Sequence, residues 1–363
     1  MTGPSGDVRP MPMEGHGAYN RNSRVQAAGL LPAVTLLQDA TRIVPLESGT
    51  QPVLVADYGA SSGRNSLVPM AAAIGVLRER LGPERAISIV HTDLPGNDFT
   101  ALFQTLEDDP DSYLKGDPAA FASAVGRSFY EQILPPESVT LGWSSWAVQW
   151  LSRVPAVIPD QVQIAFSRDP DACAAFARQA AQDWRTFLFA RSRELRPGGR
   201  LVVLTMAVDD AGEFGYRPLL AAIQATLEGM VREGFIRPDE LRLMAIPTVG
   251  RSRAELAAPL EDGGLGGLTI AHLEVFHAED RIWAQFEADG DAQAFGAQWA
   301  AFSRASVFPT LAGALEGGRD DPRAAGFMER LEAGTRVQLA AAPEPMLIPL
   351  AKMVIAKDVP AGG

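Results

Sequence analysis

Two acidic residues follow two short apolar runs, and a glycine-rich loop comes directly after the first of them. The first run, Pro52–Asp57, continues into Gly59-Ala-Ser-Ser-Gly63, and the second, Ala86–His91, is followed by Asp93. Glycines let the backbone approach a ligand closely, and the carboxyl edge of a parallel sheet is the usual crevice for nucleotide-like ligands. These residues therefore predict a site for a nucleotide-like cofactor.

The loop lacks the signature of a pyrophosphate site. Residues 57–63 do not read G-x-G-x-x-G, and G-x-x-x-x-G-K-[ST] occurs nowhere in the chain. One glycine pair with an acid before it suits a ligand without a pyrophosphate, such as S-adenosylmethionine. Asp93 is placed to accept hydrogen bonds from ribose hydroxyls. Taken alone, the loop could also be an ordinary strand–helix turn.

The elements that must position these residues alternate along the chain. Strands are expected at 52–57, 86–91, 139–143, 199–205, 268–276 and 346–355, and helices separate most of them. A helix is also expected at 19–41, with a kink at Pro32. This alternation predicts an α/β fold, with a mostly parallel sheet and helices on both faces.

Three parts of the chain are expected to differ in character. Residues 1–12 are rich in proline and glycine, which predicts a mobile segment. Residues 13–210, with 265–290 and 343–357, are expected to form the core. Residues 211–264 and 291–342 hold longer helical patterns than crossovers need, so they predict a helical cap over the carboxyl ends of the strands.

Composition narrows the possible partners. The chain has 363 residues, with 32 Lys and Arg against 44 Asp and Glu, for a net charge of −12. Nucleic-acid binders usually carry basic surfaces, so nucleic acid is not expected as a partner. Apolar runs such as 201–208 are far shorter than the roughly 20 residues of a membrane span, and no apolar secretory signal is visible. We expect a cytoplasmic protein with a small-molecule substrate.

Several motifs follow one another in the order found in a known family. Residues 55–66 read V-A-D-Y-G-A-S-S-G-R-N-S, residues 91–99 read H-T-D-L-P-G-N-D-F, and residues 144–155 read S-S-W-A-V-Q-W-L-S-R-V-P. The chain resembles the SABATH methyltransferases, plant enzymes that methylate salicylate, benzoate, jasmonate, indole acetate and xanthines. Shorter matches at 17–26, 128–135, 268–276 and 304–305 extend the resemblance over roughly residues 13 to 355.

The resemblance implies a class I methyltransferase fold, with a Rossmann-like sheet under an α-helical cap. It implies S-adenosylmethionine as cofactor and S-adenosylhomocysteine as product. It implies that Gln26 and Trp150 are the catalytic residues that grip the substrate carboxylate, because amide and indole N–H groups donate without carrying a charge. The implied cofactor-binding residues are Ser23, Asp57, Gly59, Asn65, Asp93, Leu94, Ser128 and Phe129. The implied substrate-pocket residues are Tyr19, Trp143, Trp146, Gln149 and Arg217.

Some positions depart from the family pattern. Trp143 replaces a His, Trp146 stands where Tyr is usual, and Arg217 falls where many members have a pocket Trp. We hypothesise that Arg217 pairs with a second polar or anionic group on the substrate, such as a second carboxylate. The alternative is that it points away from the pocket. Residues 242–245 lack the metal ligands that some members carry there, so no metal is expected.

These observations predict a carboxyl O-methyltransferase that forms a methyl ester by in-line SN2 transfer. A carboxylate is already ionised at neutral pH, so the reaction needs no general base. Two alternatives stay open: an N-methyltransferase acting on a purine-like or other heterocycle, and a catalytically inactive binding protein of the same fold. A homodimer is a possible assembly, because plant relatives are commonly dimers.

Overall fold

The computed structural model describes residues 24–261 and 265–359. Within these ranges, residues 24–29 and 319 are described by their backbone only. The predicted mobile segment 1–12, the predicted pocket residue Tyr19 and the predicted cofactor residue Ser23 lie outside this range. The side chain of Gln26 lies outside it as well, although its backbone belongs to helix α2 (Arg24–Ile43).

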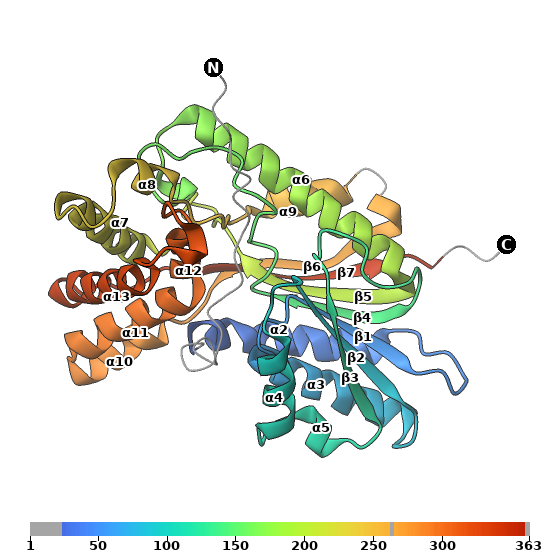
Figure 1. The fold of residues 1–363 in the computed structure, drawn as a ribbon. Coiled ribbons are helices and arrows are strands. Elements are labelled where there is room, and N and C mark those ends of the chain that lie inside the picture. Colours follow the sequence, from blue (N-terminus) through green and yellow to red (C-terminus); the bar gives the residue numbers. More distant parts are fainter. Residues whose placement is uncertain (1–23, 262–264, 360–363) are drawn as a thin grey trace.

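A seven-stranded sheet runs through the centre of the molecule, in the order β3-β2-β1-β4-β5-β7-β6 (Figure 1). The strands are β1 (Val53–Tyr58), β2 (Ile87–Asp93), β3 (Ala120–Gly126), β4 (Val139–Ser145), β5 (Leu195–Met206), β6 (Leu268–His277) and β7 (Pro349–Lys357). Strands β1 to β5 are parallel, and β7 runs antiparallel to both β5 and β6. The predicted α/β fold with a mostly parallel sheet is confirmed.

Helices cover both faces of the sheet. On one face, α2 and α3 (Arg64–Leu81) pack against side chains such as Val55 and Leu141. On the other, α6 (Pro170–Glu194) packs Trp184 and Phe187 against Val203. Successive strand residues point to opposite faces, so each strand supplies both layers. Two further helices, α4 (Phe99–Asp108) and α5 (Tyr113–Gly116), lie near α3.

A second group of helices, which we call the cap helices, gathers beyond one end of the sheet (Figure 1). They are α7 (Arg217–Arg232), α8 (Pro238–Leu243), α10 (Arg281–Asp289), α11 (Ala292–Ser306), α12 (Phe308–Ala312) and α13 (Ala324–Ala341). Strand β5 runs toward this group, so the cap helices lie at the carboxyl ends of the parallel strands.

The boundaries of this group differ from those predicted. Helix α10 was placed in the core segment 265–290, yet the ring of its Trp283 meets that of Phe295 in α11 at a centroid distance of 6.0 Å. Helix α9 (Arg253–Ala257) was placed in the cap, yet its Leu256 packs on the face of the sheet that α6 covers. Short 3-10 turns complete the structure at Ile164–Phe166, Ala258–Leu260, Leu265–Gly267 and Gly318–Asp320.

Helix α2 contains Pro32, where a kink was expected, and runs on to Ile43. Two local features differ from the sequence prediction. The helical segment predicted at 291–342 is divided, and its first helix, α11, ends before Val307, after which α12 begins. Strand β3 was not predicted, because its sequence, A-F-A-S-A-V-G, lacks a continuous apolar run. No helix among the described residues is both long and apolar enough to cross a membrane.

Candidate active site

The turn between β1 and α3 is built around Gly59. Its φ of 89° lies in the left-handed region, and an added Cβ would stand 2.4 Å from the Cβ of Ala147. The amide groups of Gly59 and Ala60 donate to the carbonyl of Thr92 at 2.9 and 3.0 Å. Only glycine fits here without strain, so the turn holds the ends of β1 and β2 close together.

Asp57, at the end of β1, is buried within a hydrogen-bonded chain. Its Oδ2 accepts from Ser66 Oγ at 2.5 Å and lies 2.8 Å from His91 Nδ1. The other ring nitrogen of His91 lies 2.7 Å from the hydroxyl of Tyr113. The sequence analysis did not predict the roles of His91 and Tyr113, which hold the Asp57 carboxylate in place through this hydrogen-bonded chain. Their signal was weak because a buried histidine inside an apolar strand resembles core.

Asp93, at the end of β2, is gripped by backbone amides. Its Oδ2 accepts from Ser61 N and its Oδ1 from Leu94 N, both at 2.7 Å. Burial raises the pKa of Asp93 to about 6, although these two amides lower it. Asn97 Nδ2 also donates to the Ser61 carbonyl at 2.8 Å, which fixes the loop beside the carboxylate.

The remaining predicted cofactor residues surround the same edge. Asn65 lies in the first turn of α3, directly after the glycine loop. Ser128 Oγ accepts from Tyr130 N at 3.3 Å, and the Phe129 ring reaches toward Gly59. Glycine backbone and an acceptor-only carboxylate with spare lone pairs suit a ribose and its adenine, so the residues present fit S-adenosylmethionine.

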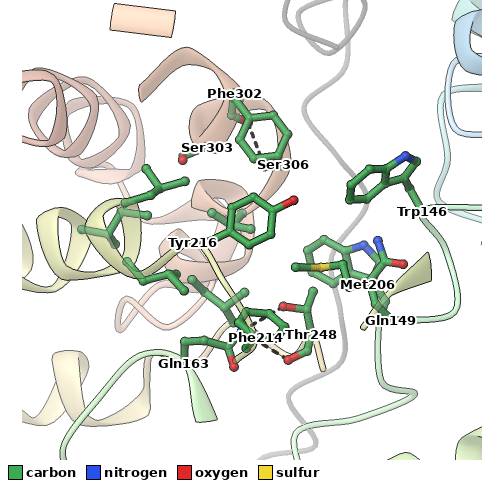
Figure 2. A pocket seen from close by; sticks show the side chains of 16 residues that line it. Trp146, Gln149, Gln163, Met206, Phe214, Tyr216, Thr248, Phe302, Ser303 and Ser306 are labelled. Carbon is green, nitrogen blue, oxygen red and sulfur yellow. Dashed lines mark hydrogen bonds between the residues drawn. The ribbon is translucent and has the colours of Figure 1, made fainter. Parts of the chain in front are cut away.

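A pocket lies between the sheet edge and the cap helices, with about 610 Å³ of empty space that opens to solvent (Figure 2). The loop after β4 supplies Trp146, Gln149 and Trp150, and β5 supplies Met206. Helices α7 and α11 supply mainly apolar side chains from the cap side. Among the described residues, no Asp, Glu, Lys, Arg or His side chain lines this pocket.

Hydrogen-bond donors inside the pocket are left without partners. The Trp146 indole N–H and the Tyr216 hydroxyl are buried and have no partner in the part of the chain that the structure describes. Gln149 is buried too, and its Oε1 accepts from Thr205 Oγ1 at 3.2 Å. Buried polar groups normally find partners, so unpaired donors in a pocket indicate a ligand that accepts hydrogen bonds.

Trp146 and Tyr216 are also unusual in their backbones. Their φ angles are 54° and 58°, in the left-handed region that bulky residues rarely adopt. Trp146 N donates to the Leu204 carbonyl at 2.9 Å, and Tyr216 N donates to the Leu347 carbonyl at 3.1 Å. Strained conformations persist where the surroundings impose them, and they concentrate at functional sites.

Arg217 does not face the pocket, which overturns its predicted place. Its side chain is 63% exposed and pairs with Glu213 at 3.1 Å. The guanidinium also lies over the Phe166 ring, 4.3 Å from its centroid. The aromatic pocket wall is supplied instead by the preceding residue, Tyr216. An arginine at this apolar wall would need a buried partner, whereas outside it stays solvated.

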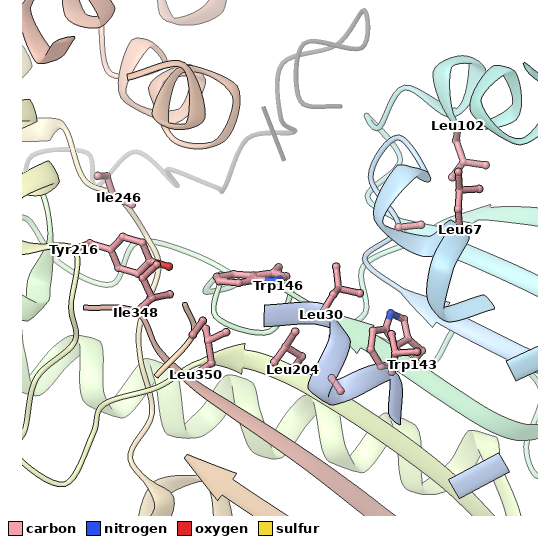
Figure 3. Packing of buried hydrophobic residues seen from close by; sticks show 14 of the residues in the cluster. Leu30, Leu67, Leu102, Trp143, Trp146, Leu204, Tyr216, Ile246, Ile348 and Leu350 are labelled. Carbon is pink, nitrogen blue, oxygen red and sulfur yellow. The ribbon is translucent and has the colours of Figure 1, made fainter. Parts of the chain in front are cut away.

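Trp143 is also misplaced in the sequence prediction. It lies in the middle of the sheet, fully buried, and packs in the core near Leu30 of α2 rather than in the pocket (Figure 3). Trp146, three residues later, is the tryptophan that reaches the pocket. The difference arises because Trp143 still belongs to β4, whose side chains are committed to the core faces.

Other polar candidates form no shared site. His272 lies 3.6 Å from Glu274, whereas His277 pairs with Asp209 at 3.0 Å. Cys173 is a free thiol in α6. Across residues 24–261 and 265–359, no group of three or more His, Cys, Asp or Glu side chains is arranged to hold a metal ion.

Comparison with known proteins identifies this arrangement. The sequence profile of a family described as SAM dependent carboxyl methyltransferase matches residues 8–320. Salicylate carboxymethyltransferase of Clarkia breweri is 30% identical over 290 residues, covering 76% of this chain and 78% of that protein. The chain belongs to this family. Methyltransferase FUS9 of Gibberella fujikuroi is 29% identical over 257 residues, covering 70% of this chain and 68% of that protein.

The fold agrees with that of a solved relative. The structure of loganic acid methyltransferase with SAH matches with a TM-score of 0.76 at 21% identity, covering 98% of this chain and 100% of that chain. Our chain therefore has the class I, Rossmann-like methyltransferase fold. It uses S-adenosylmethionine and forms the methyl ester of a small-molecule carboxylic acid. The predicted family, cofactor and activity are confirmed.

Proposed function

We propose that the pocket between β4, β5 and the cap helices holds the acid, and that Gln26 and Trp150 grip its carboxylate. The observation that carries this proposal is the pocket lining, which is uncharged among the described residues and holds the buried Trp146 indole N–H without a described partner. Neutral donors orient a carboxylate without neutralising it, so its oxygen stays nucleophilic.

The backbone around Trp150 is well suited to hold it. Its carbonyl accepts from the Tyr130 hydroxyl at 2.5 Å, its amide donates to the Ala147 carbonyl at 3.0 Å, and it pairs with Thr248 in an isolated antiparallel bridge. A side chain on an anchored backbone loses less entropy when it binds substrate. Gln26 lies in the first turn of α2, and its role is proposed from the family motif.

For the cofactor, we propose that Asp93 accepts from the ribose hydroxyls. We propose that Asp57, Asn65, Leu94, Ser128 and Phe129 bind the cofactor too, and the family resemblance adds Ser23, which lies outside the described residues. S-Adenosylmethionine, when bound, supplies a methyl group on positively charged sulfur that a carboxylate attacks in line. The protein's part is to position the acid, to keep it ionised and to exclude water with the cap helices.

Two variants test the carboxylate grip. Gln26→Ala and Trp150→Phe each remove one proposed donor without touching the β1–α3 turn. Each should lower kcat/KM for the acid by roughly ten-fold, the cost of about one charge-assisted hydrogen bond, while the affinity for S-adenosylmethionine stays unchanged. Steady-state kinetics and calorimetry supply the two readouts. Wild-type kcat/KM in both variants would contradict the proposal.

We also propose that the protein acts in the cytoplasm and assembles as a homodimer. The cytoplasmic proposal rests on the single cysteine of the sequence, Cys173, which allows no disulfide within it, and the dimer rests on the family resemblance alone. Light scattering coupled to size-exclusion chromatography measures the mass in solution, and a value near one 38.8 kDa chain would contradict the dimer.

A further inference from the structure

Three hydroxyl groups line the pocket from the side of the cap helices. They belong to Tyr216, at the start of α7, and to Ser303 and Ser306 in α11 (Figure 2). All three side chains line the pocket, and Tyr216 is only 4% exposed. These hydroxyls interrupt a wall that is otherwise formed by residues such as Leu219 and Ile223.

The hydroxyl groups of the two serines already donate hydrogen bonds within α11. Ser303 Oγ donates to the Trp299 carbonyl at 3.0 Å, and Ser306 Oγ donates to the Phe302 carbonyl at 2.7 Å. A hydroxyl has one donor and two acceptor positions, so each serine oxygen can still accept a hydrogen bond. The serines therefore offer acceptors to the pocket and no further donor.

Tyr216 offers a hydrogen-bond donor to the same pocket. Its hydroxyl is buried and has no partner among the residues that the structure describes. Burial raises the pKa of Tyr216, so the phenol keeps its proton at neutral pH and remains a donor. Its backbone is held by the hydrogen bond from Tyr216 N to the Leu347 carbonyl at 3.1 Å.

One donor and two acceptors in the same pocket match a hydroxyl group, which accepts once and donates once. We propose that Tyr216, Ser303 and Ser306 form a subsite for a hydroxyl group on the substrate, distal to the methylated carboxylate. This inference rests on the proposed place of the acid in the pocket. A second carboxylate fits poorly, since it would meet two acceptor oxygens and no cation. A plain hydrocarbon would leave the Tyr216 hydroxyl unpaired.

The experiment compares hydroxy acids with their parent acids. The probes are benzoate with its 3- and 4-hydroxy derivatives, and octanoate with 8-hydroxyoctanoate. Release of S-adenosylhomocysteine gives kcat/KM, and calorimetry gives the affinity for each acid independently of turnover. Wild-type protein should prefer at least one hydroxy acid over its parent by roughly ten-fold in both readouts, because the parent leaves a buried donor unpaired.

Variants assign that preference to the subsite. Tyr216→Phe should bring the hydroxy-to-parent ratio close to one, both in kcat/KM and in the calorimetric affinity. Ser303→Ala and Ser306→Ala should each reduce the ratio. Thr335→Val is the matched control, because Thr335 has another buried hydroxyl without a described partner, and it lies outside the pocket. This control should leave the ratio at its wild-type value.

Two results would overturn the subsite. One is a wild-type protein that binds no hydroxy acid more tightly than its parent. The other is a preference that survives Tyr216→Phe. Failure of the proposed acid pocket looks different: Trp150→Phe would then leave kcat/KM unchanged for hydroxy and parent acids alike.

Discussion

Asp93 combines burial with two backbone hydrogen bonds, and its ionisation should control cofactor binding. Burial raises the pKa of its carboxyl to about 6. In the proposed complex the ionised form accepts from the ribose hydroxyls, so below pH 6 binding would first have to release a proton. The affinity for S-adenosylmethionine should therefore fall as the pH drops, by about ten-fold between pH 7 and pH 5.

Calorimetric titration of S-adenosylmethionine across pH 5–8 measures this dependence without an acid substrate. Asp93→Asn removes the titrating group, so its binding should be weaker than wild type at pH 7 and nearly independent of pH. A wild-type affinity that stays constant from pH 7 to pH 5 would show that Asp93 does not meet the ribose as proposed.

Arg217 leads to a prediction of no effect on substrate choice. The side chain lies outside the pocket, with Glu213 and Phe166 as its contacts. Arg217→Leu should leave the ratio of kcat/KM between a dicarboxylic acid and its monoacid analogue unchanged. It should cost at most about 1 kcal/mol of unfolding free energy, as expected for an exposed ion pair. A ratio that shifts by ten-fold would place the guanidinium back in the pocket.

At the scale of elements, the β1–α3 turn is the most constrained part of the cofactor edge. Gly59→Ala would place a methyl 2.4 Å from Ala147 Cβ at a φ of 89°. It should lower the free energy of unfolding by about 2–4 kcal/mol, from backbone strain plus overlap, and weaken cofactor binding. Denaturant unfolding and calorimetry measure the two effects.

Two companion variants separate strain from overlap. Gly234→Ala also has a positive φ, 72°, but no atom lies within 4 Å of the new methyl, so it should cost only about 1–2 kcal/mol and leave cofactor binding intact. Ala147→Gly added to Gly59→Ala removes the overlapping methyl and should recover part of the stability. Equal losses at Gly59 and Gly234 would refute the overlap.

The same elements show what the sequence could and could not predict. Strands β1, β2 and β4 were predicted within a few residues, because parallel strands buried on both faces leave continuous apolar runs. The glycine loop and Asp93 came with them, since their places follow from strand ends. Edge strand β3 left no such run and was missed.

The pocket was harder to predict because distant segments build it. Trp146 and Gln149 were found, since they lie within a motif after β4, but Thr248, Ser303 and Ser306 come from segments that only folding brings together. Tyr216 and Arg217 are neighbours in sequence, yet one lies inside and the other outside. Which one enters depends on the left-handed φ of Tyr216 at the start of α7, and local sequence patterns do not reveal that angle.

At the scale of the whole molecule, the net charge of the chain and the uncharged lining of the pocket restrict the partner in different ways. The net charge of −12 disfavours anionic polymers as partners and suits a small, diffusible substrate. The pocket itself is uncharged among the described residues and lies where the cap helices meet the carboxyl ends of the strands. In the proposed complex, neutral donors hold the carboxylate there, which leaves its charge available for attack on the methyl.

The central claim is ester formation at this pocket, and the product tests it most directly. The protein is incubated with S-adenosylmethionine carrying a labelled methyl group and with the acid panel, and the products are treated with mild base. We predict one labelled methyl ester per S-adenosylhomocysteine released, with the label freed as methanol by base. Label that survives base would indicate N-methylation, and no S-adenosylhomocysteine with any acid would indicate a binding protein; either result would contradict the account.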